Sequence, residues 1–195
     1  SIKRKSTGRE LEVWTDKLLQ QGILLNKVQI EFFNKVDNLV SGLYEKHQNK
    51  KDLSFLESLK VNFYQGWTQG ESLKLSLKKS LEKDMALGYT TEGPHRFDLK
   101  FSVNNKPVKS TLSRGQQKLL ILLVILRLDD LLSSTNPCGV VYLIDDLSSE
   151  LDSVNLNIAL KEVAELNSQV IVTSIKEKGE LKNKGFLNQF KQINL

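Results

Sequence analysis

The sequence predicts an α/β fold in which a helical arm segment precedes a β/α sheet domain that carries a hairpin. Apolar residues recur at spacings of three, four and seven over 8–47, the pattern of one long amphipathic helix. From residue 113 onward, helical stretches alternate with two short apolar runs, 140–144 and 169–173, as in parallel strands joined by helices. We therefore expect an arm at 1–52 and a sheet domain at 53–195.

The arm helix is expected at 8–47, which is longer than the helices of most globular domains. Two interpretations stay open for it: an ordinary bundle helix, or an arm packed on a partner helix from outside this chain. Gly22 weakens the apolar pattern and marks a point where the helix could break. His47 stands at the end of this helix, where we expect it to face solvent.

Shorter elements follow the arm. Alternating apolar and polar residues over 59–63 predict a half-buried strand, and 71–85 has the apolar period of a second amphipathic helix. A β-hairpin is expected from Phe97–Val103, through the turn Asn104–Pro107, into Val108.

The sheet domain should then continue with a helix over 113–132, a strand over 140–144, a helix over 154–166 and a strand over 169–173. The five apolar residues of the first of these strands suit a strand that is covered on both faces. A last short strand is expected over Phe190–Asn194.

Composition excludes several classes of protein. The 195 residues are 39% hydrophobic, enough for a core, and the longest apolar run, 119–126, is far shorter than the roughly 20 residues that cross a bilayer. The single cysteine, Cys138, rules out an intrachain disulfide and fits a reducing cytoplasm. The net charge of +5 is compatible with contact to a polyanion. Because no initiator methionine precedes the helical pattern, we expect an excised fragment.

The run Leu112–Gln116, Leu-Ser-Arg-Gly-Gln, places a small hydroxyl residue and a glycine directly before a long apolar helix. Amide groups in the first turn of a helix lack partners within the helix, and the helix dipole is positive there. Gly115 lets a ligand come close to these amides. The run therefore predicts an anion site, although Ser113 is equally a good N-cap with no ligand at all.

The strand over 140–144 ends in the carboxylates Asp145 and Asp146. Ligands of α/β sheets bind beyond the carboxyl ends of the strands. Asp145 is thus placed to hold Mg²⁺, which prefers oxygen ligands, and Asp146 could polarise an attacking water. The alternative is a pair of surface carboxylates that ends a strand. Asp152, a few residues on, could also be the N-cap of the next helix.

Together these motifs resemble the second half of an ATP-binding-cassette ATPase head of the ABC/SMC type. Leu112–Gln116 is similar to the signature motif, Val140–Asp145 to the Walker B strand and Ser149–Asp152 to the D-loop. No Gly-x-x-x-x-Gly-Lys-Ser/Thr loop, the Walker A loop of that class, occurs in the sequence. Asp146 stands where most members have glutamate, and Ser174 where most have a switch histidine.

A more specific resemblance is to the RecF family of bacterial recombination proteins, and it covers nearly the whole chain. It is carried by Tyr89–Asp98, Tyr-Thr-Thr-Glu-Gly-Pro-His-Arg-Phe-Asp, by Gly66-Trp67, and by the signature, Walker B and D-loop runs. The departures at Asp146 and Ser174 fit this family too. The resemblance implies the carboxyl-terminal half of the protein, with the Walker A loop in the other half.

The family's activity and partners follow as implications of the resemblance. It implies a cytoplasmic, weak, DNA-dependent ATPase of DNA repair, recombination, replication and the SOS response, with ATP and Mg²⁺ as cofactors. Such a protein would form an ATP-dependent homodimer on gapped DNA and act with RecO and RecR to load RecA, with no membrane contact. This chain alone, lacking the Walker A loop, would be inactive.

The resemblance also assigns roles to single residues. Ser113 and Gly115 would contact the γ-phosphate of ATP held by the opposite subunit, supported by Arg114 and Gln116. Asp145 would serve the metal site and Asp146 the water. The D-loop residues Ser149 and Asp152 would lie at the dimer seam.

The segment Gly93–Arg96 has two open interpretations: a turn that shapes the hairpin, or a DNA or interdomain contact made by His95 and Arg96. Two histidines and one distant cysteine do not form a zinc site. Two other functions also remain open. One is a different SMC-like head, and the other is a helical scaffold or adaptor that binds no nucleotide.

Overall fold

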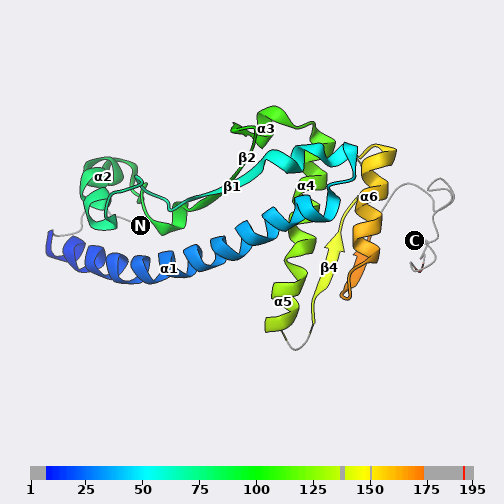
Figure 1. Ribbon diagram of the computed structural model, residues 1–195. Helices are drawn as coiled ribbons and strands as arrows, with labels where there is room; N and C mark the ends of the chain where they lie inside the picture. Colours follow the sequence, from blue (N-terminus) through cyan, green and yellow to red (C-terminus); the bar gives the residue numbers. More distant parts are fainter. Residues whose placement is uncertain (1–7, 137–138, 150, 174–190, 192–195) are drawn as a thin grey trace. The chain divides into compact units, whose positions relative to one another are not determined.

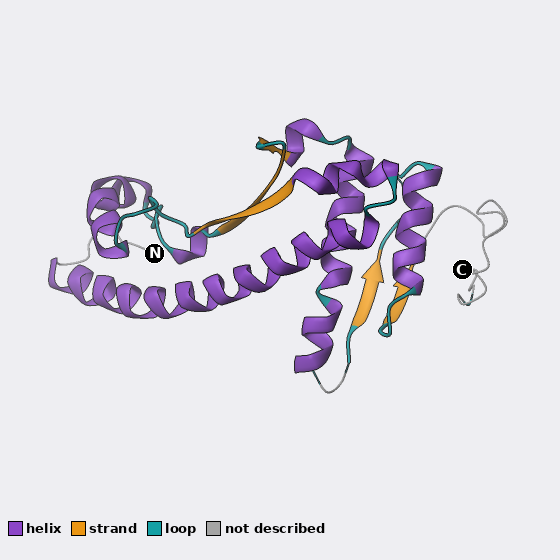
Figure 2. Ribbon diagram, viewed as in Figure 1, coloured by secondary structure: helices purple, strands orange, loops and turns teal. Residues whose placement is uncertain are grey.

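The computed structural model describes residues 8–136, 139–149, 151–173 and 191 (Figures 1 and 2). The chain divides into two compact units. Unit 1 comprises Ser1–Asn38 and Lys60–Ser102, and unit 2 comprises Leu39–Leu59 and Val103–Leu195. The predicted boundary near Asp52 stays a prediction.

Helix α1 runs from Gly8 to His47, as the apolar period predicted (Figure 1). Gly22 does not break it. A Cβ atom at Gly22 would lie 2.8 Å from the Cδ2 atom of Leu73, so the glycine permits close packing. Within the predicted apolar stripe, Val36 and Leu43 are buried, whereas Trp14 and Phe32 are exposed.

Unit 1 places a helix and most of a small sheet beside the first part of α1. Helix α2, Leu73–Leu87, begins at the N-cap Ser72 and ends at Gly88 in the left-handed conformation. Trp67, Leu73 and Leu77 form a buried cluster to which Leu18 and Leu19 of α1 contribute. The indole nitrogen of Trp67 donates to the carbonyl oxygen of Glu71 at 3.0 Å, so its polar group is satisfied within this core.

The predicted hairpin is present but shorter than expected. The sheet has the order β1-β2-β3, with β1 at Leu59–Tyr64, β2 at Asp98–Val103 and β3 at Lys106–Pro107. Val108 does not continue the hairpin, because it begins the short helix α3, Val108–Thr111. A 3₁₀ helix, Lys51–Ser58, precedes β1.

Unit 2 contains the β/α part of the fold. Helix α4 spans Arg114–Arg127, α5 spans Asp129–Thr135, and α6 spans Ser153–Ala164. Strand β4, Val141–Ile144, pairs in parallel with β5, Gln169–Val172, and Ile144 is opposite Val172. Helices α4 and α6 pack together. Buried residues on the two helices include Leu119, Leu123, Leu156, Ala159 and Val163.

The predicted helix over 113–132 is divided at Leu128, between α4 and α5. The buried carboxylate of Asp129 begins the second helix, and its Oδ1 atom accepts hydrogen bonds from Ser133 and Ser168. The apolar period continues through this point, so the division was not visible in it.

Strand β4 is not covered on both faces within the described residues. Tyr142 is 8% exposed, whereas Val141 and Leu143 are 55% and 76% exposed. Leu143 is opposite Ile171, which is also half exposed. The expectation of two covered faces was therefore wrong for the described part of the chain. The described sheet has only the strands β4 and β5, with one face toward the helical core.

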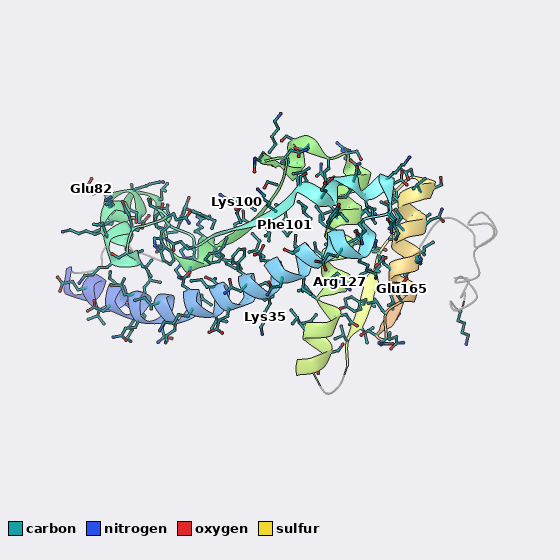
Figure 3. The ribbon with its side chains drawn as sticks, viewed as in Figure 1. Lys35, Glu82, Lys100, Phe101, Arg127 and Glu165 are labelled. Carbon is teal, nitrogen blue, oxygen red and sulfur yellow. The ribbon has the colours of Figure 1, made fainter. Side chains whose placement is uncertain are left out.

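His47 is buried, which corrects the expectation that it faces solvent. Its Nε2 atom lies 3.6 Å from the buried Oε1 atom of Glu162 on α6. Lys46 contacts the same glutamate at 2.6 Å and Glu165 at 2.8 Å. Glu165 is labelled in Figure 3. The end of α1 thus joins α6 through charged groups rather than facing water.

Among the described residues, no helix combines the length and the apolar character that a membrane crossing requires. Apart from Lys191, the predicted strand at Phe190–Asn194 lies outside the described residues, as do the cysteine Cys138 and the switch position Ser174.

Candidate nucleotide half-site

The signature run forms a capping box at the start of α4. The Oγ atom of Ser113 accepts a hydrogen bond from the amide of Gln116 at 3.2 Å. The Oε1 atom of Gln116 in turn accepts from the amide of Ser113 at 3.0 Å. This reciprocal pair fixes the helix start. The N-cap interpretation of Ser113 is confirmed, and it leaves the hydroxyl hydrogen of Ser113 without an acceptor among the described residues.

The amides of Arg114 and Gly115 take no hydrogen bond within the described part of the chain. They point out of the first turn of α4, where the dipole of the helix is positive. The exposed side of this helix forms a shallow hollow lined by Arg114, Gln117, Lys118 and Ile121. Chemically, this end of α4 can accept an anion.

The two predicted carboxylates stand at the carboxyl end of β4. Asp145 is exposed, and its Oδ1 atom accepts a hydrogen bond of 2.6 Å from the Thr173 hydroxyl at the end of β5. The amide of Asp146 donates to the same hydroxyl oxygen at 2.8 Å. One threonine therefore contacts both members of the pair.

Asp146 has a left-handed backbone, with φ at 44°. Its Oδ1 atom is buried and accepts no hydrogen bond from the described residues. A buried carboxylate oxygen without a donor is costly unless a ligand satisfies it.

The carboxylates of Asp145 and Asp146 are candidate ligands of Mg²⁺. Within the described residues, no group of three or more His, Cys, Asp and Glu side chains could hold a metal ion alone. Mg²⁺ usually takes one or two protein carboxylates together with phosphate oxygens and water. The carboxylates of Asp145 and Asp146 fit such a shared site and do not form a closed protein cage.

Lys118 ties the signature helix to the turn that follows β4. Its ammonium donates to the carbonyl oxygen of Asp146 at 2.8 Å, and to the carbonyl oxygen and hydroxyl of Ser149 at 3.1 and 3.2 Å. These three acceptor atoms belong to Asp146, in the turn after β4, and to Ser149, at the start of the predicted D-loop. The start of α4 and the end of β4 are thus held together within unit 2.

Asp152 is the N-cap of α6, as one interpretation of the sequence predicted. Its Oδ1 atom accepts from the amides of Val154 and Asn155 at 3.0 and 2.8 Å. Its Oδ2 atom accepts from the side chain of Asn155 at 3.0 Å. Glu150 of the same run lies outside the described residues.

His95 and Arg96 are not near this site in the sequence and belong to unit 1. Both are exposed, in a short 3₁₀ helix, Pro94–Arg96. Nε2 of His95 lies 3.0 Å from the carbonyl oxygen of Thr90, and the guanidinium of Arg96 lies 5.8 Å from the centre of the Tyr89 ring. A contact to DNA or to another domain stays a prediction for these residues.

The turn that carries His95 and Arg96 is tightly held. The amide of Gly93 donates to the carbonyl oxygen of Gly66 at 2.9 Å, and the side chain of Gln29 donates to the carbonyl oxygen of Pro94. Gly66 has φ at 99°, and a Cβ atom there would lie 2.0 Å from the carbonyl oxygen of Gly93. The role of Gly66 is therefore close approach, and the shaped-turn interpretation accounts for these contacts.

Thr173 and Lys118 are the two residues of the site that the sequence did not single out. Thr173 is the last residue of an apolar run, and Lys118 is one lysine in an apolar helix. Their partners lie 27 to 31 positions away along the chain. The one available signal is position, because Thr173 directly precedes the switch position Ser174.

Comparison with known proteins gives a consistent answer. No family model matches the sequence. The DNA replication and repair protein RecF of Shewanella denitrificans is 31% identical over 174 residues, 89% of this chain and 47% of the relative. RecF of Vibrio cholerae is 30% identical over 176 residues, 90% of this chain and 47% of the relative. The chain therefore spans about half the length of the curated relatives it matches.

Solved structures agree with the sequences. A structure of the recombination mediator protein RecF-ATPrS in the RecFOR pathway aligns with a TM-score of 0.66 at 27% identity, over 90% of this chain and 48% of that one. A structure of RecF-ATP in the same pathway aligns with a TM-score of 0.65 at 26% identity, over 89% and 47%. The predicted α/β fold with a helical part is confirmed. In sequence and in fold, the chain is thus homologous to the RecF family of DNA replication and repair proteins, over about half the length of its members.

Proposed function

We propose that this chain supplies the signature, Walker B and D-loop half of the nucleotide site in a RecF-like ATPase, as the carboxyl-terminal half of that protein. The observation that carries the proposal is that Lys118 joins helix α4 to the turn after strand β4 by hydrogen bonds. Its ammonium contacts the carbonyl oxygens of Asp146 and Ser149 from the helix that begins at Ser113. An anion-binding helix start and a metal-binding turn are thereby fixed to each other, while the loop that cradles the phosphates is absent from this sequence.

In this proposal, the start of α4 binds the γ-phosphate of ATP held by an opposite subunit. The amides of Arg114 and Gly115 and the hydroxyl of Ser113 donate to the phosphate oxygens, and the helix dipole adds attraction. Gln116 holds the hydroxyl in place through the capping box. The exposed guanidinium of Arg114 lies beside these donors, in the same hollow.

Asp145 and Asp146 divide the remaining chemistry between them. The exposed carboxylate of Asp145 would hold Mg²⁺, which neutralises charge on the phosphates when it is bound. The carboxylate of Asp146, whose Oδ1 atom is buried without a donor among the described residues, would accept a hydrogen bond from the attacking water and orient it. Ser149 and Asp152 would lie at the seam between the subunits.

The names of the relatives support a proposal for the process in which the complete protein acts. Curated relatives are DNA replication and repair proteins, and the matched structures carry ATP or ATPrS and belong to the RecFOR pathway. We infer that the complete protein works in the cytoplasm as an ATP-dependent homodimer on gapped DNA. There it would act with RecO and RecR to load RecA.

The test uses the complete ATPase, meaning this chain joined to the part of the Shewanella denitrificans RecF protein that it does not match. The complete ATPase should hydrolyse ATP in the presence of Mg²⁺ and DNA, and Asp145→Ala should abolish the turnover. This chain alone should not hydrolyse ATP, because it lacks the phosphate-binding loop and its lysine. Mg²⁺-dependent turnover by the chain alone, above its Asp145→Ala control, would contradict the half-site.

A further inference from the structure

We propose that the hydroxyl of Thr173 is a positioning group that fixes the Asp145 carboxylate and the Asp146 backbone in one arrangement. The inference rests on the proposed function, which gives Asp145 to the metal ion and Asp146 to the water. It adds Thr173, the residue directly after strand β5. Neither the sequence motifs nor the comparisons give Thr173 a role.

The backbone of Thr173 is held on both sides. Its amide donates to the carbonyl oxygen of Ile144 at 3.0 Å, and its carbonyl oxygen accepts from the amide of Leu147 at 3.1 Å. These bonds extend the parallel pairing of β4 and β5 past Ile144 and Val172. The Thr173 side chain therefore starts from a backbone that β4 and the turn after it define.

The hydroxyl has one hydrogen, so the direction of its hydrogen bonds is determined. The amide of Asp146 has only a hydrogen to give, and it donates to Oγ1 at 2.8 Å. The hydroxyl hydrogen is then directed to the Oδ1 atom of Asp145, at 2.6 Å. A hydrogen bond to a charged carboxylate is of the short, strong kind.

This chain of hydrogen bonds has two consequences. With Oδ1 of Asp145 occupied by the hydroxyl, Oδ2 has no donor among the described residues and is the oxygen available to a cation. The hydrogen bond from the Asp146 amide to Oγ1 also stabilises the backbone of Asp146 at φ 44°. This conformation costs energy in residues other than glycine. Loss of the hydroxyl would release the Asp145 carboxylate and the Asp146 backbone.

The test compares Thr173→Val with Thr173→Ser in the complete ATPase. Valine keeps the shape and the β-branch and removes both hydrogen bonds, whereas serine keeps the hydroxyl. Mn²⁺ binding is measured by electron paramagnetic resonance with ATPγS bound, so the readout does not depend on turnover. Thr173→Val should weaken Mn²⁺ binding by about tenfold or more, since hydrogen bonds to charged groups are among the stronger ones. Thr173→Ser should stay within about threefold of the unmodified protein, because its hydroxyl remains.

Ser168→Ala is the matched control. It removes a hydroxyl–carboxylate hydrogen bond of the same 2.6 Å length, from Ser168 to Asp129, just before β5 begins and so at the other end of that strand. It should leave Mn²⁺ binding unchanged. An unchanged Mn²⁺ affinity in Thr173→Val, or equal losses in the serine and valine variants, would overturn the inference.

Asp145→Asn separates this inference from the proposed function. If Asp145→Asn weakens Mn²⁺ binding and Thr173→Val does not, only the role of Thr173 fails. If Asp145→Asn has no effect on Mn²⁺ binding, the proposed metal role of Asp145 fails, and the positioning role of Thr173 fails with it.

Discussion

The ammonium group of Lys118 donates a hydrogen bond of 2.8 Å to the carbonyl oxygen of Asp146. Lys118 is in the second turn of the helix that begins with the signature run, and Asp146 follows strand β4. One side chain therefore links the helix that begins with the signature run to the turn that carries the carboxylates.

Lys118→Met should loosen this turn while it keeps the apolar part of the side chain. Carbonyl oxygens of Asp146 and Ser149 lose their donor, so the free energy of unfolding should fall by about 1–3 kcal/mol. ATP hydrolysis by the complete ATPase should fall by about tenfold, because the turn that carries the Asp146 carboxylate is less well held. Urea denaturation and steady-state hydrolysis measure the two effects. Lys161→Met, at an exposed lysine of α6, is the control. Equal behaviour of the two variants would argue against a specific role for Lys118.

The two carboxylates should respond differently to neutralisation. Asp145→Asn should weaken Mg²⁺-dependent hydrolysis by removing a charge directed at the metal ion. Asp146→Asn should slow hydrolysis and spare ATP binding, because a residue that orients the water acts mainly in the transition state. Asp146→Asn dimers should then persist on gapped DNA after ATP is diluted away. Dimers that dissociate as fast as the unmodified protein would mean that Asp146 does not direct the water.

The buried His47 predicts an acid-sensitive fold. Burial lowers the pKa of His47 below its ordinary 6.5, Glu162 opposes this change, and the cations Lys50, Lys46 and Arg127 add to it. As the pH falls through about 6.5, the unfolded histidine binds a proton that the folded one does not. Stability should therefore decrease below that pH, by at most about 1.4 kcal/mol per pH unit, until the folded histidine also titrates.

Urea denaturation between pH 7.5 and 5.5, with a parallel titration of the His47 ring by nuclear magnetic resonance, checks this expectation. His47→Gln should make the free energy of unfolding less dependent on pH over that range. A His47 pKa at or above 6.5 in the folded chain would contradict the account of its burial.

Local patterns predicted the elements well where one period extends over many residues. Helix α1 has the predicted bounds because its apolar period continues for 40 residues. The same reasoning missed the division at Leu128, because the apolar period continues from α4 into α5 and the buried contact of Asp129 with Ser168 depends on the tertiary structure. The open face of β4 was also missed, since a run of apolar residues does not show what covers it.

The candidate site was predictable only in its motif residues. Ser113, Gln116 and Asp152 act as caps within three residues of their partners, a range that sequence patterns describe well. Thr173 and Lys118 form hydrogen bonds with Asp145 and Asp146, which are distant in the sequence and close only in the folded chain. His47 was placed at the surface because it ends a helix, and its burial depends on Glu162 of a distant helix. Contacts of this kind need the tertiary structure.

If the start of α4 binds a nucleotide held by an opposite subunit, the bulky cation of Ser113→Arg should block dimerisation without disturbing nucleotide binding by the same subunit. Sedimentation velocity of the complete ATPase is measured with ATPγS and Mg²⁺, after each variant has been shown to bind nucleotide. Ser110→Arg, at an exposed serine of α3, is the control for a bulky cation nearby. Ser113→Arg should bind nucleotide normally but sediment as a monomer, while Ser110→Arg and the unmodified protein should sediment as dimers. A normal nucleotide-dependent dimer of Ser113→Arg would contradict it.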